Sequence, residues 1–149
     1  MRGQFVAVLA VVVLAGCSSM GSVDAGLVDG KLRLCPDAPH CVSSDATDSG
    51  HQIAALAING DASVAWSALK AYLTKAPHVV IVEEKDGYLH ATATSAMMGF
   101  VDDFEFVLRA DKNEMGMRSS SRIGYYDFNV NRTRLEGVRS ALQAKGVLK

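Results

Sequence analysis

Residues 79–121 contain four consecutive strand-like segments, and this pattern restricts the fold more than any other feature of the chain. In the third segment Phe104, Phe106 and Leu108 alternate with Asp103 and Glu105. An alternation with a period of two is typical of a strand with one buried face. Short turn signals separate the segments, so neighbouring strands are expected to pair antiparallel.

Amphipathic helices are expected before and after these strands, because apolar residues recur at the spacing of one helix face (Ala62, Trp66, Leu69 and Leu73; Leu135, Val138 and Leu142). Asp61 would cap the first helix and Pro77 would end it, while Asn129 or Asn131 would cap the second. The short apolar run at residues 53–58 is expected to add an edge strand. This order predicts an α+β domain, with an antiparallel sheet of about four or five strands and both helices on one face.

The first 16 residues have the features of a lipoprotein signal peptide. Arg2 precedes the unbroken apolar run at residues 5–15, which as a helix would reach only ~16 Å, about half of a ~30 Å hydrocarbon layer. Residues 14–17 (LAGC) resemble the lipobox of bacterial lipoproteins, in which the cysteine is diacylated and becomes N-terminal after cleavage. We therefore predict a signal peptide over residues 1–16 and a palmitate-type anchor at Cys17. An ordinary signal peptide with an incidental Cys17 is the alternative.

The predicted location is the bacterial cell envelope, with the lipid-anchored protein facing the periplasm. Ser18 instead of aspartate follows the cysteine, and in lipoproteins of Gram-negative type this resembles sorting to the outer membrane. Residues 17–30 are small and polar and are expected to form a flexible tether of roughly 20 Å, with residues 31–149 as one domain. The membrane is thus an expected partner, through the anchor.

The charge balance argues against nucleic-acid binding. Removing residues 1–16 removes only Arg2, which leaves 15 − 1 = 14 Lys+Arg against 16 Asp+Glu and a side-chain net charge of 14 − 16 = −2. A nucleic-acid-binding domain normally carries a clear positive excess on one face.

Cys35 and Cys41 lie at the ends of a turn that Pro36 and Pro39 stiffen. In an exported protein this pair predicts a disulfide. A metal site that includes His40 and a redox-active pair are the alternatives. The C-x5-C spacing differs from the C-x2-C of zinc knuckles and of thioredoxin-type sites.

The segment at residues 117–135 is very polar and has two interpretations. Guanidinium groups match carboxylates and phosphates bidentately, so the segment could bind an anionic envelope component such as a lipid headgroup or a sugar acid. The predicted ligand set is Arg118, Ser120, Arg122, Asn131 and Arg132. Alternatively, arginines of this segment pair with Asp103 and Glu105 across the strands and fix the sheet register. Between its end residues Met117 and Leu135, the large apolar side chains that the segment offers for burial are only Ile123, Tyr125, Tyr126, Phe128 and Val130.

An enzyme is a third interpretation. Asp102, Asp103, Glu105 and His90 could form the acid/base or metal-binding set of a hydrolase. The chain has no G-x-S-x-G, H-E-x-x-H, P-loop or glycine-rich dinucleotide motif, and we predict no cofactor and no metal. We favour a non-enzymatic module that binds an anionic ligand or an envelope protein, or that has a structural task.

Four blocks of sequence resemble successive blocks of one family. They are CPDAPHCVSS (35–44), YLHATATS (88–95), FVDDFEF (100–106) and RSSSRIGYYDFNVNRTRLEGVR (118–139). The chain is similar over about residues 35–143 to the domain of unknown function numbered 1499. No activity is established for this family, and its occurrence in bacterial envelope and plastid-type proteins implies an exported location. His40 stands where members usually have asparagine, and Tyr126 and Phe128 replace smaller residues.

Overall fold

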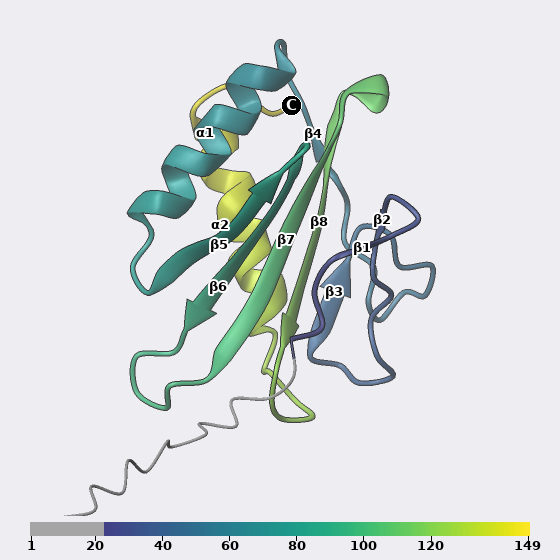
Figure 1. Cartoon of the computed structure of the whole chain (residues 1–149), viewed down its shortest axis with the longest axis vertical. Coiled ribbons are helices and arrows are strands. Elements are labelled where there is room, and N and C mark those ends of the chain that lie inside the picture. Colours follow the sequence, from purple (N-terminus) through teal and green to yellow (C-terminus); the bar gives the residue numbers. More distant parts are fainter. Residues whose placement is uncertain (1–22) are drawn as a thin grey trace, which may run out of the picture.

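The computed structural model describes residues 23–149, so the predicted signal peptide and Cys17 lie outside the described residues. In chain order the elements are β1 (Leu27–Val28), β2 (Lys31–Leu32), β3 (Cys41–Ser43), β4 (Leu56–Ala57), α1 (Ala62–Lys75), β5 (Val79–Lys85), β6 (Tyr88–Thr94), β7 (Val101–Arg109), the 3-10 turn η1 (Ala110–Lys112), β8 (Glu114–Ser121) and α2 (Val130–Ala144) (Figure 1).

The main sheet is antiparallel and has six strands. Its order is β3-β8-β7-β6-β5, and β4 also pairs with β8. The predicted α+β fold is confirmed, but the strand count is higher than expected. The reason is that β8 is long enough to pair with β4 near its start, at Met115, and with β3 near its end, at Ser120.

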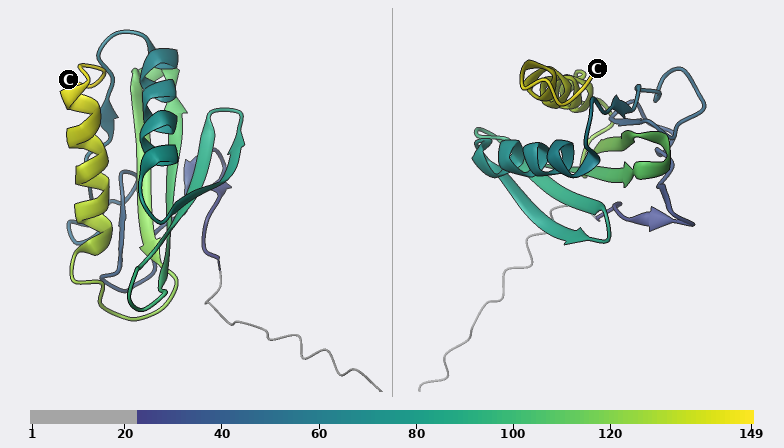
Figure 2. Two further views of the ribbon diagram at one scale, coloured as in Figure 1. Left: turned by 90° about the vertical axis from the view of Figure 1, so that its left-hand side faces the viewer. Right: turned by 90° about the horizontal axis from the view of Figure 1, so that it is seen from above.

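Both helices cover one face of the sheet (Figure 2). The alternating side chains of the strands meet the helices on this face, as the period-two pattern predicted. The core includes Leu89, Phe104, Phe106, Met115 and Met117 from the strands, and Trp66, Leu69, Leu73, Leu135, Val138 and Leu142 from the helices. Removing these apolar surfaces from water is the main stabilising contribution to the fold.

The turns and helix ends follow local sequence signals. The Asp61 carboxylate accepts hydrogen bonds from the N–H groups of Ser63 (2.7 Å) and Val64 (3.1 Å), which confirms the predicted cap of α1. Asp86 and Gly87 join β5 to β6 with φ values of 51° and 77°. Two consecutive positive φ values are typical of the two-residue hairpin turn that suits the twist of paired strands.

Residues 24–32 lie on the sheet face opposite the helices (Figures 1 and 2). There β1 and β2 form a small hairpin, joined by Asp29 and Gly30 with φ values of 50° and 75°. This arrangement differs from the predicted flexible tether over residues 17–30, since its described part from Asp24 onward contacts the sheet. The dipeptide Asp29-Gly30 is a hairpin signal that could have revealed it.

Neither helix of the part between residues 23 and 149 combines the length and hydrophobicity that a membrane crossing requires.

Candidate functional site

The sheet face opposite the helices is largely polar, although much of it is buried. We call this set of side chains the polar seam: Tyr88, His90, Asp103, Glu105, Arg118, Ser120 and Arg122. They share one face because they alternate with the core residues of β6, β7 and β8. The register places Glu105 directly opposite Arg118 and also beside His90. The cross-strand pairing predicted from the sequence is therefore confirmed.

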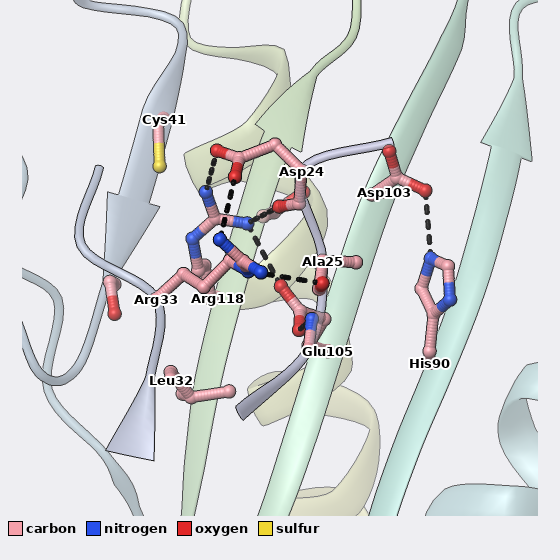
Figure 3. A network of polar contacts seen from close by, with 12 residues as sticks. Asp24, Ala25, Leu32, Arg33, Cys41, His90, Asp103, Glu105 and Arg118 are labelled. Carbon is pink, nitrogen blue, oxygen red and sulfur yellow. Dashed lines mark hydrogen bonds and ion pairs between the residues drawn. The ribbon is translucent and has the colours of Figure 1, made fainter. Parts of the chain in front are cut away.

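Glu105 and Arg118 form the centre of the seam (Figure 3), and both side chains are 0% exposed. Arg118 Nη1 donates to Glu105 Oε2 at 2.9 Å. The other carboxylate oxygen, Oε1, accepts from the Gly26 N–H at 2.6 Å and from the Tyr88 hydroxyl at 2.7 Å. Burial, together with the hydrogen bond to Glu105 and its charge, raises the pKa of Tyr88. The phenol therefore stays protonated and keeps its role as donor.

The N-terminal segment closes over this ion pair. Arg118 Nη1 also donates to the Asp24 carbonyl at 2.7 Å, and Nη2 donates to Asp24 Oδ2 at 2.8 Å. The buried guanidinium of Arg118, on β8, thus joins Glu105 of β7 to Asp24, which lies 94 positions before Arg118 in the sequence. A buried charge is tolerated only when it is paired and hydrogen-bonded, and Asp24 supplies two of the acceptors of this guanidinium. Its Nε is buried without a hydrogen-bond partner among residues 23–149.

Asp103 is the second acidic group of the seam. Arg122 reaches it with two hydrogen bonds of 2.8 Å, and His90 Nε2 lies 2.7 Å from Oδ1. Burial by itself raises the pKa of Asp103, but the hydrogen bonds from Arg122 and His90 outweigh burial, so this pKa lies below its usual value. The hydrogen bond to Asp103 raises the pKa of Arg122. The pair is therefore charged at neutral pH.

The Asp103 pair is expected to make stability fall in acid. Because the folded-state pKa is lower than the unfolded value, near 3.8, its contribution is complete above that value and is lost as the pH falls through the folded pKa. Asp103→Asn should cost about 2 kcal/mol at pH 7, and the difference from wild type should shrink towards pH 3. Urea denaturation at several pH values measures this. A difference that stays constant with pH would contradict it.

Asn131 lies on the opposite face of the sheet and organises a second buried network. Its side chain is fully buried, and Nδ2 donates to the His40 carbonyl (3.0 Å), to Ser121 Oγ (2.8 Å) and to Asp127 Oδ2 (2.8 Å). Its Oδ1 accepts from the Ser119 hydroxyl and from Arg134. The Asp127 carboxylate also accepts the N–H groups of Asn129 and Asn131. Asn129, one of the two predicted caps, holds the N-cap position of α2, but its side chain makes no capping hydrogen bond. The Asp127 carboxylate fills that role instead.

The predicted disulfide between Cys35 and Cys41 is confirmed, with the two Cα atoms 5.6 Å apart. Both sulfurs are used in the bond, so they are not available for the alternative metal site with His40. Among residues 23–149, no three His, Cys, Asp or Glu side chains are grouped closely enough to hold a metal ion. The disulfide loop contacts the rest of the domain through the His40 carbonyl, which accepts from Asn131 and from the Ser121 N–H.

A polar cavity of about 280 Å³ lies where the seam meets the disulfide loop. Its lining includes Ser120, Arg122 and His40, together with Asp24 and Asp103. Arg122 brings a positive charge to this cavity, but its guanidinium is paired with Asp103 in the same lining. The local charge is therefore compensated.

The structure divides the predicted anion-binding set. Ser120 and Arg122 share the polar cavity, and Arg118 is on the same face but fully buried beneath Asp24. Asn131 lies on the helix side of the sheet, and Arg132 donates instead to the carbonyls of Gln52 (2.9 Å) and Gly50 (3.3 Å). The five residues do not form one pocket.

The weaker enzymatic set is divided as well. Asp103, Glu105 and His90 face the seam, but Asp102 faces the helices and pairs with Arg134 at 2.7 Å. His90 is 5% exposed. A general base must reach the proton that it removes from a substrate, and this imidazole faces Asp103 inside the protein.

Sequence reasoning missed Asp24, Tyr88, Asp127 and Arg134 as members of these networks. Tyr88 could have been found, because it shares the strand face of His90. Asp24 gave no signal, since its partner Arg118 is far away in the sequence and nothing local requires the contact.

We compared the chain with protein families, curated proteins and solved structures. Residues 31–142 match the model of the family described as "Protein of unknown function (DUF1499)". The searches of curated proteins and of solved structures gave no significant match. The match confirms the resemblance of the four sequence blocks, and the lipid anchor stays a prediction.

Proposed function

Since the chain belongs to the family of proteins of unknown function DUF1499, we propose its role from its own contacts: it is a lipid-anchored cell-envelope protein with a non-enzymatic, structural domain. The membrane is its partner through Cys17, and the domain faces the periplasm, with the outer membrane as the preferred location. One observation carries this proposal. The segment Asp24–Gly26, which follows the predicted anchor closely in the sequence, is hydrogen-bonded to the buried Arg118 and Glu105 of the sheet.

The polar seam suits a mechanical role. Any force that acts between a lipid at Cys17 and the domain enters the fold at Asp24, which Arg118 holds by two hydrogen bonds. Gly26 adds a third contact through Glu105. Glu105 and Arg118 come from β7 and β8, two neighbouring interior strands of the sheet, so the load passes to strands that are paired on both sides.

Anion binding at the polar cavity is the second candidate. The observation in its favour is that Ser120, Arg122 and His40 all line this cavity. Against it, the carboxylates of Asp24 and Asp103 line the same space and would repel an anion. Both arginines of the seam, Arg118 and Arg122, are already paired with carboxylates of the protein itself, and we therefore place the structural role first.

Replacing Cys17 with serine tests the anchor. We expect radiolabelled palmitate to be incorporated into the wild-type protein and to be lost completely from Cys17→Ser, because serine has no thiol to accept the lipid. The variant should also keep residues 1–16, which intact mass measures. Ser19→Ala is the matched control and should keep both label and cleavage. A wild-type product without palmitate, or one found uncut in the cytosol, would end the proposal.

A further inference from the structure

Large apolar side chains are exposed on two loops at one end of the sheet. The loop from β6 to β7 (residues 95–100) and the loop from β8 to α2 (residues 122–129) both lie at the end where β7 begins and β8 stops (Figure 1). We call these side chains the apolar tip: Met97, Met98, Phe100, Tyr125, Tyr126 and Phe128. Met97 and Phe128 are 94% and 92% exposed. The sequence had offered the three aromatic residues of the second loop for burial, and the structure does not bury them.

The two loops form one continuous surface. Phe100 from the first loop lines the same apolar cavity of about 260 Å³ as Tyr126 and Phe128 from the second. The rings of Tyr125 and Tyr126 pack edge to face, with centroids 5.0 Å apart. Contiguous exposed apolar surface of this kind marks an interaction site on a soluble domain.

The tip also carries little net charge. Residues 95–100 (SAMMGF) contain no charged side chain. In the second loop the charges are Arg122 and Asp127, and both are engaged, Arg122 by Asp103 and Asp127 by the start of α2. The tip thus combines methionine and phenylalanine side chains with two tyrosines. This composition suits the boundary between lipid headgroups and acyl chains, where tyrosine rings are enriched.

The chain enters the domain from this same end. Leu32 packs with Val107 near the far end of β7, Gly26 lies against Glu105, and Asp24 shares a cavity with Asp103. From Leu32 back to Asp24, the chain therefore runs along β7 towards the start of this strand, and the start of β7 lies beside the tip. Asp24 also lines that cavity together with Arg122, the first residue of the second tip loop.

We propose that the apolar tip docks into the surface of the lipid bilayer to which the protein is anchored. This inference rests on the proposed function, because the short anchor makes the bilayer the nearest apolar partner. Residues 17–23 span at most ~25 Å even when fully extended, so a lipid on Cys17 keeps the tip end next to the membrane. Docking would set the orientation of the domain, with the opposite end of the sheet directed away from the bilayer.

Tryptophan quenching in the full-length protein tests this orientation. Phe128→Trp places a probe at the tip, and Val64→Trp places one on the first turn of α1, which begins at the end of the molecule opposite the tip (Figure 1). Both positions are exposed apolar residues, so the two variants are matched, and native Trp66 gives the same background in each. In phosphatidylcholine vesicles with brominated acyl chains, we expect quenching of Phe128→Trp and none of Val64→Trp. Equal quenching of both probes, or none at the tip, would overturn the proposal.

A second change tests the apolar character of the contact. Adding Met97→Asp to Phe128→Trp should reduce the inserted population about tenfold, since a carboxylate replaces a large apolar side chain in the apolar layer. Unchanged quenching would contradict docking through the tip. Palmitate labelling separates this result from that of the anchor. If the protein is labelled with palmitate but its tip probe is not quenched, the anchor is supported and the docking is refuted. If the protein is not labelled but its tip probe is quenched when vesicles are added, the docking is supported and the anchor is refuted.

Discussion

Replacing Arg118 with methionine is expected to lower the free energy of unfolding by about 3–5 kcal/mol. The substitution keeps most of the apolar stem and removes the guanidinium that Glu105 and Asp24 share. Glu105 is 0% exposed and would keep a buried charge without a cation, which is the costly state for a broken internal ion pair. Denaturation in urea, followed by circular dichroism, measures the loss.

Two further variants separate this cost from the mere loss of a surface charge. Lys70→Met removes the cation of an exposed pair with Glu84, whose N···O distance of 2.8 Å resembles that of the buried pair. It should cost less than about 1 kcal/mol. The double variant Arg118→Met, Glu105→Gln should recover part of the stability, because it removes the isolated charge. An Arg118→Met loss no larger than that of Lys70→Met would refute the structural interpretation of the seam.

Replacing Asn131 with leucine is expected to cost about 3 kcal/mol. Leucine has a similar volume, so the change tests hydrogen bonds more than packing. It removes the amide partner of the buried Ser119 hydroxyl and of the half-buried His40 carbonyl and Ser121 hydroxyl. Each buried polar group that loses its partner costs roughly 1–3 kcal/mol before the site relaxes. Thermal or urea denaturation measures the total.

The disulfide loop should loosen in the same variant. The Ser121 N–H donates to His40, whose carbonyl Asn131 holds in place, so hydrogen exchange at Ser121 should accelerate in Asn131→Leu. Asn59→Leu is the matched control, because Asn59 is exposed and makes one side-chain hydrogen bond, to the Gly146 carbonyl. It should cost under about 1 kcal/mol. Equal losses in the two variants would show that the Asn131 network adds nothing beyond an ordinary surface contact.

Local patterns predicted the body of the domain well. The period-two alternation in β7 assigned Phe104 to the core and Glu105 to the other face, and both assignments are correct. Asp61 and Pro77 predicted the bounds of α1 for similarly local reasons, a side-chain cap and a missing N–H group. Such signals depend on neighbours within a few residues, so they can be recognised without the fold.

The site was less predictable, because its contacts join distant parts of the chain. Arg118 was predicted to pair with Glu105 or to bind an anion, and only the structure shows it buried beneath Asp24. The sequence alone does not distinguish an arginine that pairs with an internal carboxylate from one that binds an external anion. The choice depends on whether another segment covers the face, and here residues 24–32 do so.

The amino-acid sequence was thus sufficient for the four long strands, both helices, the disulfide and the family, since each rests on short-range chemistry or on ordered sequence blocks. The folded chain decided which charges neutralise each other and which apolar residues stay outside. Phe128 is apolar yet 92% exposed, and Arg118 is charged yet completely buried. Neither result follows from residue type, because burial depends on which surfaces meet when segments far apart in sequence come together.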